Sequence, residues 1–282
     1  MRDHPRDSTT IHIRADGFSL DPEEILSLLE DPSACTVFAT TVTQIHDKYV
    51  VKRCRRLVEA MNSELARQNT TIPIPKVLLA FCIDGSLYIV FEAIRGVPLH
   101  HVWPRSNKEE REAMTLTVAS YVRQLRQIEP LDSRPGHVDP KFPWHGTFFS
   151  LDQIYPFESH EELVNWLNRC AATTKRLMPE YKLPTFTTQN YRLTFTHGDI
   201  SVHNFVVDGN NLLWMIDWDT AGWFPEYMEY ACIKWEVVNP VLPKDQMIEW
   251  TEMLTSAIDP YDEESHMMHS LLWITTTRPF ML

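Results

Sequence analysis

The first 92 residues alternate short apolar runs with polar turns, a pattern that predicts strands. Each run is a few residues long, rich in β-branched and aromatic side chains, and bounded by polar positions. One segment between the second and third runs differs, because Leu57, Ala60, Met61 and Leu65 recur at helical spacing. Residues 1–19 are expected to form an arm and 20–29 a short helix. The runs that we interpret as strands are 36–43, 49–53, 77–82 and 87–92.

Beyond residue 96 the apolar positions follow a helical period. Capping boxes of the form S-x-x-E predict helix starts at Ser106 and Ser159. Pro225 favours the first turn of another helix, and the segments 248–258 and 264–276 predict two more. A strand-rich lobe followed by a helical lobe indicates an α+β fold. The stretch 130–156, rich in Pro, Gly and aromatic residues, is too long for a plain connector, so we expect it to fold over a binding site.

Within the helical part, two apolar segments end in polar side chains. The motif HGD closes the first segment with Asp199, and Asn204 follows five positions later. The second segment, 212–216, ends at Asp217. Residues 208–211, Asp-Gly-Asn-Asn, tolerate the backbone angles of a tight reversal. We therefore expect a hairpin that brings the three polar side chains to one end.

These residue types at this spacing indicate phosphoryl transfer, because such enzymes mainly position the acceptor and neutralise charge. A carboxylate beside the acceptor hydroxyl can orient it and take its proton, a role that fits Asp199. An amide oxygen and a second carboxylate are hard ligands that suit Mg²⁺, a role that fits Asn204 and Asp217. A solvated hairpin end would explain any one of these residues alone, but not the set of three.

The motifs HGDISVHN and IDWDTAGWFPEYMEY resemble the aminoglycoside phosphotransferase family of kinase-like enzymes, most closely its fungal members. The segments TTIPIPKVLLAF, YIVFEAIRGVPLHHVWP and YPFESHEELVNWL resemble further blocks of that family in the same order, so the likeness covers about residues 36–262. It implies a protein-kinase-like, two-lobed fold. Residues 1–92 would form the arm and a nucleotide-binding small lobe with an antiparallel sheet and one helix. Residues 93–282 would form the hinge and a mainly helical large lobe that carries the catalytic hairpin.

The resemblance also implies ATP and Mg²⁺ as cofactors and a small-molecule hydroxyl as acceptor. Asp199 would be the catalytic base, Asn204 and Asp217 the magnesium ligands, and Lys52 the strand lysine that holds the nucleotide phosphates. An acid on the following helix should pair with that lysine. Likeness of VEAMNSELARQNT to the family favours Glu59, whereas Glu64 lies nearer the apolar stripe.

Residues 91–96 read as the link between the lobes. Backbone groups from Glu92 to Ile94 are expected to bond the edge of adenine. One family feature is missing, since residues 35–49 contain no glycine although a phosphate-covering loop needs close backbone approach. The turn 39–41 could supply backbone N–H and hydroxyl donors instead. The gap also keeps open a noncatalytic relative that binds a nucleotide or a partner.

Other polar residues near the motifs have more ordinary interpretations. We expect His197 to brace the HGD loop and Trp218 to pack. Asp219 would cap the turn toward Gly222 or approach the metal. Glu226 and Glu229, near a helix start, are interpreted as partners of the helix dipole, with the acceptor pocket as the alternative.

Bulk properties fit a cytoplasmic enzyme and exclude some classes. The net charge of −12 argues against binding to nucleic-acid backbones, which select basic surfaces. Five scattered cysteines without a C-x-x-C pair indicate a reducing compartment. No apolar run approaches the ~18 residues of a membrane helix, so no membrane partner is expected. The pair His100-His101, with His266 and His269, lacks zinc-ligand spacing, and the sequence leaves the oligomeric state open.

Overall fold

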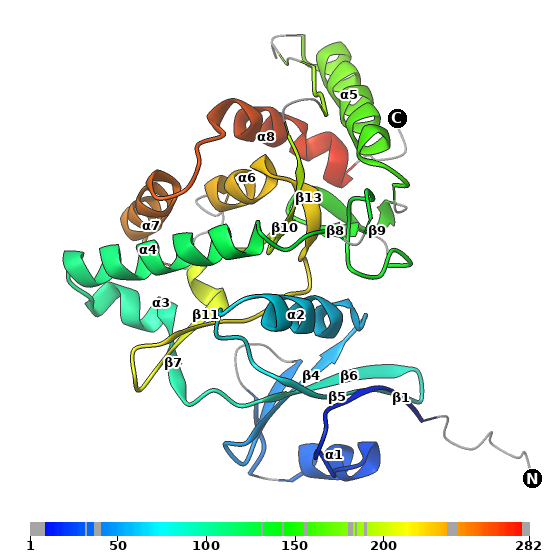
Figure 1. The fold of residues 1–282 in the computed structure, drawn as a ribbon, viewed down its shortest axis with the longest axis vertical. Coiled ribbons are helices and arrows are strands. Elements are labelled where there is room, and N and C mark those ends of the chain that lie inside the picture. Colours follow the sequence, from blue (N-terminus) through cyan, green and yellow to red (C-terminus); the bar gives the residue numbers. More distant parts are fainter. Residues whose placement is uncertain are drawn as a thin grey trace, which may run out of the picture.

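The computed structural model describes residues 9–31, 33–36, 41–130, 132–142, 144–154, 157–179, 183, 185–188, 191–235 and 242–277. Its first part is a six-stranded antiparallel sheet with the strand order β1-β5-β6-β4-β3-β2 (Figure 1). Three of the predicted strands are present to within one residue at each end. The single strand predicted over 36–43 is wrong, because the chain reverses within that range and forms two strands that pair antiparallel, with Thr36 opposite Thr43. The strands are β1 (Thr10–Arg14), β2 (Cys35–Thr36), β3 (Val42–Ile45), β4 (Tyr49–Cys54), β5 (Val77–Ile83) and β6 (Ser86–Glu92).

Strand β1 corrects the expectation that residues 1–19 form only an arm. It pairs antiparallel with β5, from Thr10 opposite Cys82 to Arg14 opposite Leu79. The sequence signal is weak because β1 is an edge strand whose side chains are mostly exposed, so no apolar stripe marks it.

Two helices cover the faces of this sheet, α1 (Pro22–Leu29) and α2 (Val58–Asn69) (Figure 1). On one face, Ile25 of α1 packs with Val51 and Leu79. On the other face, Ala60 of α2 packs with Ile89. Helix α2 also reaches the large lobe, since Ala66 belongs to the core of that lobe. The helix is therefore packed on both sides, which fixes its position between the lobes.

The large lobe begins after residues 93–95 and is mainly helical, with short strands that frame the hairpin (Figure 1). Its helices are α3 (Leu99–Val102), α4 (Lys108–Leu125), α5 (His160–Leu177), α6 (Tyr227–Trp235), α7 (Lys244–Ser256) and α8 (Asp262–Thr277), with 3-10 turns η1 (Trp103–Arg105) and η2 (Val202–Asn204). Its strands are β7 (Gly96–Pro98), β8 (Trp144–Gly146), β9 (Phe149–Ile154), β10 (Leu193–Thr196), β11 (Phe205–Asp208), β12 (Leu213–Met215) and β13 (Gly222–Pro225). The predicted α+β fold is thus confirmed.

The starts of the helices agree only partly with the capping signals in the sequence. Helix α4 is capped by Asn107, whose side chain accepts from the N–H of Glu110, so the predicted box at Ser106 is displaced by one position. Asparagine competes well with serine as an N-cap, and both frames contain a glutamate. Ser159 caps α5 as predicted. Pro225 closes β13 instead of opening α6, because its strand pairs with β10.

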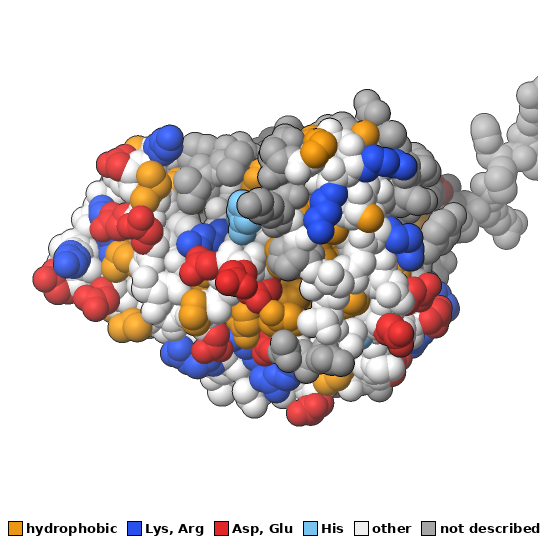
Figure 2. Space-filling view, turned by 90° about the horizontal axis from the view of Figure 1, so that it is seen from above, with side chains coloured by type: hydrophobic (Ala, Val, Ile, Leu, Met, Phe, Trp, Pro, Cys, Tyr) orange, Lys and Arg blue, Asp and Glu red, His pale blue; other side chains and the backbone are white. Residues whose placement is uncertain are grey.

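The hairpin packs against the main hydrophobic core of the large lobe. Phe195, Phe205, Met215 and Trp218 are all buried in it. Acidic and basic side chains are intermixed on the face of the large lobe shown in Figure 2, with no continuous basic surface among the described side chains there. Within the described residues, no helix is both long and apolar enough to span a bilayer.

Candidate active site

The predicted hairpin is formed by β11 and β12, with Phe205 opposite Met215. Asp208 shapes its turn by accepting from the N–H groups of Asn210 and Leu212. Asn211 adopts a φ of 61°, the left-handed conformation that asparagine tolerates. Strand β7 pairs along the other edge of β11, so the hairpin lies beside the link between the lobes.

Asp199 and Asn204 are joined at the end of this hairpin. The amide nitrogen of Asn204 donates to the backbone oxygen and to Oδ2 of Asp199, both at 2.8 Å. These bonds orient the amide so that its oxygen, Oδ1, points away from Asp199 and remains available. Among the described residues, no group bonds Oδ1 of Asp199, so one oxygen of each side chain is free for a ligand.

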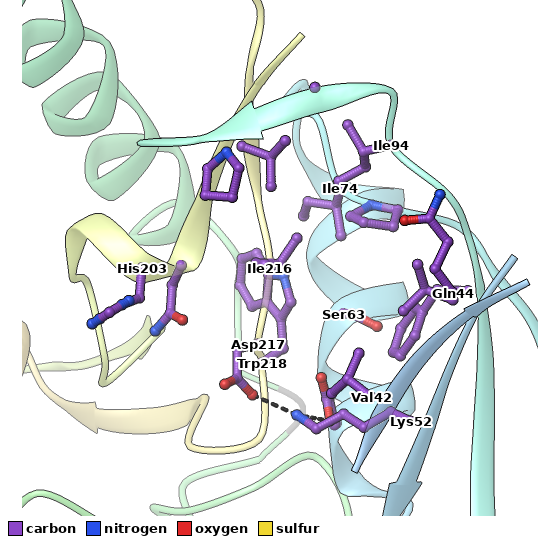
Figure 3. A pocket seen from close by; sticks show the side chains of 18 of the residues that line it. Val42, Gln44, Lys52, Ser63, Ile74, Ile94, His203, Ile216, Asp217 and Trp218 are labelled. Atoms are coloured by element: carbon purple, nitrogen blue, oxygen red, sulfur yellow. Dashed lines mark hydrogen bonds and ion pairs between the residues drawn. The ribbon is translucent and has the colours of Figure 1, made fainter. Parts of the chain in front are cut away.

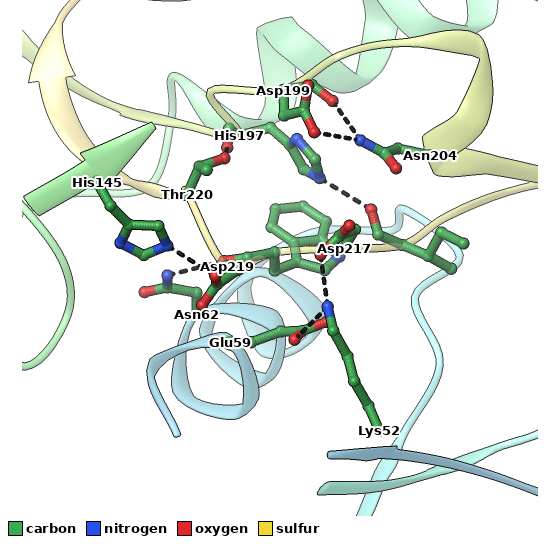
Figure 4. A network of polar contacts seen from close by, with 12 residues as sticks. Lys52, Glu59, Asn62, His145, His197, Asp199, Asn204, Asp217, Asp219 and Thr220 are labelled. Atoms are coloured by element: carbon green, nitrogen blue, oxygen red, sulfur yellow. Dashed lines mark hydrogen bonds and ion pairs between the residues drawn. The ribbon is translucent and has the colours of Figure 1, made fainter. Parts of the chain in front are cut away.

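Asp217 lies across from this pair and meets a lysine from the small lobe (Figure 4). Its carboxylate is 2.7 Å from Nζ of Lys52, and the same ammonium is 2.7 Å from Glu59 of α2. Burial alone would lower the pKa of Lys52, but the carboxylates of Glu59 and Asp217 outweigh it and raise that pKa. Lys52 is therefore charged. Glu64 is turned elsewhere, toward Arg67.

The backbone of Asp217 adopts a φ of 65°, which is rare for a residue with a side chain. Such a conformation persists only where neighbouring contacts hold it. Behind it, the ring of His197 donates from Nε2 to the carbonyl oxygen of Ile216 at 3.1 Å and packs against Trp218. Burial lowers the pKa of His197, so the ring is neutral and braces the loop, as expected.

A cavity of about 830 Å³ opens between the lobes at this point (Figure 3). Lys52, Asn204 and Asp217 line one end of it, and Phe91, Ile94 and Ile216 line an apolar part next to the link between the lobes. Thr41 and Val42, from the segment without glycine, also line it, whereas Ala39 and Thr40 lie outside the described residues. The volume suffices for a nucleotide-sized ligand.

The link between the lobes lies along the edge of this cavity, which Glu92 and Ile94 both line. Lys76 accepts from the backbone N–H of Glu92 and donates its own N–H to the Glu92 side chain. Ala93 donates its N–H to the carbonyl of Lys48. Among the described residues, no backbone acceptor is recorded for the N–H of Ile94.

Comparison with known proteins identifies the family. The model of the phosphotransferase enzyme family matches residues 27–249. The chain belongs to this family. A search of curated protein sequences gave no match.

Solved structures of aminoglycoside phosphotransferases share the fold of this phosphotransferase. A thermostable mutant of APH(4)-Ia in its apo form matches with a TM-score of 0.54 and 16% identity, over 85% of this chain and 83% of that chain. APH(3'')-Id from Streptomyces rimosus matches with a TM-score of 0.52 and 17% identity, over 90% and 98% of the two chains. APH(2")-IIia in complex with GDP and kanamycin matches with a TM-score of 0.53 and 12% identity, over 88% and 84%. The kinase-like fold is therefore confirmed.

Glu229 of this phosphotransferase has a role that the sequence did not reveal. Its buried carboxylate accepts from the backbone N–H of His197 at 2.6 Å and of Gly198 at 3.0 Å. Burial raises the pKa of Glu229 to about 7, although the two N–H groups oppose that rise. Glu229 lies in the first turn of α6, where the helix-dipole interpretation placed it, and its carboxylate in addition holds the HGD loop. Its place in the PEYMEY segment is the one signal that could have singled it out.

Asp219 also departs from expectation, since it neither caps the turn toward Gly222 nor joins the Asn204 and Asp217 side chains. Its carboxylate accepts from Nε2 of His145 at 2.7 Å, and the other ring nitrogen of His145 is 3.2 Å from His137. Burial would raise the pKa of Asp219, but the bond from His145 and the nearby charges of His145 and Lys52 together outweigh it and lower that pKa. His137 and His145, from the stretch predicted to fold over a binding site, therefore contact the residues that follow Asp217.

In the described part of the chain, no three His, Cys, Asp or Glu side chains are grouped to hold a metal ion.

Proposed function

We propose that this phosphotransferase transfers the γ-phosphoryl group of ATP to a hydroxyl of a small molecule in a magnesium-dependent reaction. The observation that carries this proposal is the convergence of Lys52, Asn204 and Asp217, from both lobes, at one end of the nucleotide-sized cavity, with Asp199 bonded to Asn204 beside it. These are the groups that phosphoryl transfer needs: a base, hard metal ligands and a phosphate-binding cation.

Asp199 would be the catalytic base. Its Oδ2 is held by Asn204, which leaves Oδ1 to accept the proton of the acceptor hydroxyl. The acceptor oxygen then forms its bond to the γ-phosphorus, and the bond from that phosphorus to the bridging oxygen of ADP breaks. The proton stays on Asp199 until product release, so atoms and charge balance.

Asn204 and Asp217 would hold Mg²⁺ through an amide and a carboxylate oxygen. The fit rests on the orientation of Asn204, whose amide nitrogen is committed to Asp199 and whose oxygen is left over. When bound, the ion would neutralise phosphate charge. Lys52, which bonds Asp217 without a ligand present, would turn to the α- and β-phosphates while Glu59 keeps hold of it.

The base of the nucleotide would bond Glu92 and Ile94. A carbonyl acceptor and an N–H donor two residues apart match the amino group and ring nitrogen of adenine. The side chain of Glu92 supports this role, because it takes the Lys76 N–H that would otherwise compete for the carbonyl.

A noncatalytic nucleotide- or partner-binding protein is the second candidate, favoured by the absence of glycine from residues 35–49. A noncatalytic role does not explain why Asp199, Asn204 and Asp217 are all present. We propose that the enzyme works in the cytoplasm, because its five cysteines form no disulfide in the described part of the chain.

The deciding experiment incubates purified protein with ATP, Mg²⁺ and an extract of small metabolites, and measures products by mass spectrometry. A compound that gains the mass of one phosphoryl group with wild type, and not with Asp199→Asn, is the expected result. Kanamycin and hygromycin B, bound by structural relatives, belong in the panel as test compounds. ATP binding without any phosphorylated product from a broad panel would favour the noncatalytic candidate.

A further inference from the structure

The residues after Asp217 form a turn, 218–221, in which every member is held by a hydrogen bond. The N–H of Ala221 donates to the carbonyl of Trp218, which closes the turn. Asp219 accepts from His145, and the hydroxyl of Thr220 donates to the carbonyl of His197 at 2.8 Å (Figure 4). This four-residue segment is therefore fixed on several sides.

Asn62 is the contact that reaches this turn from the small lobe. Its amide nitrogen donates to the carbonyl of Trp218 at 2.9 Å and to the carbonyl of Ala221 at 2.7 Å. Its amide oxygen is 3.4 Å from the N–H of Val138. The side chain is fully buried, and one amide thus joins α2, the turn and the segment before β8.

The position of Asn62 on α2 gives these bonds a functional meaning. Asn62 lies three residues after Glu59, so both side chains project from the same face of the helix. Glu59 holds Lys52, and Lys52 bonds the Asp217 carboxylate. Asn62 holds the carbonyl of the residue directly after Asp217. Helix α2 is therefore linked to the Asp217 side chain through Lys52 and to the turn after Asp217 through Asn62.

We propose that Asn62 is a positioning residue that maintains the left-handed backbone of Asp217 and so aims its carboxylate at the metal. A φ of 65° is disfavoured for aspartate and relaxes unless the flanking peptide groups are held. Without Asn62, the carbonyl of Trp218 keeps only the bond from the Ala221 N–H, so the turn that follows Asp217 is held less firmly. The carboxylate of Asp217 then departs more often from the geometry that a small, strictly coordinated ion requires. This inference rests on the proposed magnesium role of Asp217.

The test compares Asn62→Leu with a matched control, Asn168→Leu. Leucine has the same branched arrangement of side-chain heavy atoms as asparagine but cannot donate a hydrogen bond. Neither carbonyl of the turn is orphaned in the variant, since Trp218 still accepts from Ala221 and Ala221 still accepts from His137. Asn168 likewise makes two bonds to one backbone segment, at Phe186, but far from the cavity. Asn62→Ala serves as the second variant if the leucine protein does not fold.

Two measurements decide the proposal. Hydrogen exchange without ligand should become about 10- to 100-fold faster in peptides covering 215–222 of the Asn62 variant, as expected for two lost bonds. Calorimetric titration of ATP should show that added Mg²⁺ improves affinity about tenfold less than in wild type, while affinity in EDTA is unchanged. The Asn168 variant should match wild type in both.

Unchanged exchange in 215–222, or faster exchange with a full magnesium effect, would overturn the positioning role of Asn62. If wild type itself shows no magnesium-dependent ATP binding, the proposed function has failed. In that case the exchange measurement still decides whether Asn62 holds the turn.

Discussion

Replacing Glu229 with glutamine separates the contribution of this residue to stability from its contribution to catalysis. The carboxylate has two acceptor oxygens for the N–H groups of His197 and Gly198. Glutamine keeps the shape but offers one oxygen and one NH₂ group, so an amide N–H faces a donor. One hydrogen bond is lost, and a buried donor is left without a partner. That defect costs about 1–3 kcal/mol.

The pH dependence of this cost follows from the raised pKa of Glu229. Its pKa rises from 4.5 to about 7 because the carboxyl is buried. A group whose pKa is higher in the folded state stabilises the fold below its unfolded pKa and loses that contribution as pH rises through the folded pKa. The shift corresponds to about 3 kcal/mol, lost between about pH 4.5 and pH 7. Glutamine does not titrate and, like the protonated carboxyl, presents one acceptor and one donor. The stability of wild type relative to the variant should therefore fall by about 3 kcal/mol between pH 5 and pH 8.

Catalysis should behave differently from stability. The HGD loop loses one of its two anchors at every pH, so turnover at pH 8 should fall about tenfold, the equivalent of one hydrogen bond. The assay is denaturant unfolding of both proteins at pH 5, 6.5 and 8, with turnover on the acceptor identified by the metabolite screen. Burial also raises the pKa of Glu59 to about 7, but Glu59 is present in both proteins and cancels in the difference.

Glu226→Gln is the matched control on the same segment. Glu226 is 3.6 Å from Arg192, a side chain that is 59% exposed, so this pair should contribute under about 0.5 kcal/mol at any pH. A stability difference between wild type and Glu229→Gln that is equal at pH 5 and pH 8 would refute the raised pKa. Normal turnover in that variant would refute the anchoring role.

Three further predictions concern the proposed chemistry. Asp199→Asn should lower turnover by roughly 10²- to 10⁴-fold while ATP affinity survives, and near-normal turnover would remove Asp199 as base. Asp217→Ala should abolish the magnesium-dependent part of ATP affinity in calorimetry, and an unchanged magnesium effect would exclude it as a ligand. ATP with Mg²⁺ at ~100 times Kd should add about 2.7 kcal/mol of stability, seen as a higher melting temperature. Lys52→Ala should weaken that rise, and no shift in wild type at any ATP or GTP concentration would favour the noncatalytic candidate.

The features that sequence predicted well are those encoded locally. The hairpin was predicted from a turn signal between two apolar runs. In the structure the two strands pair with Phe205 opposite Met215, as expected for that hairpin. The strand–helix order around Lys52 is likewise a matter of adjacent segments. Choosing between Glu59 and Glu64 by periodicity alone failed, because both lie on inward parts of α2. The direction of Lys52 from β4 decides the partner, and that direction is set by the tertiary structure.

The features that sequence missed depend on partners far along the chain. Glu229 bonds backbone groups more than 30 residues earlier, and Asp219 bonds a histidine 74 residues earlier. Backbone N–H groups leave no trace in a sequence, so a buried carboxylate that serves them looks like any helix acid. Strand β1 was missed for the related reason that an exposed edge strand needs no apolar stripe.

The buried carboxylates of Glu59 and Glu229 lower the stability of the fold but hold other residues of the candidate site in place. Buried carboxylates reduce stability at neutral pH, as the raised pKa values of Glu59 and Glu229 express. Each one, however, fixes a segment that carries a proposed catalytic group: Glu59 fixes Lys52, and Glu229 fixes the loop before Asp199. A protein that only bound a nucleotide would need the cavity and the lysine, but not a loop anchored ahead of an aspartate with a free oxygen. The anchoring by Glu229 is therefore an argument for catalysis that is independent of the motif itself.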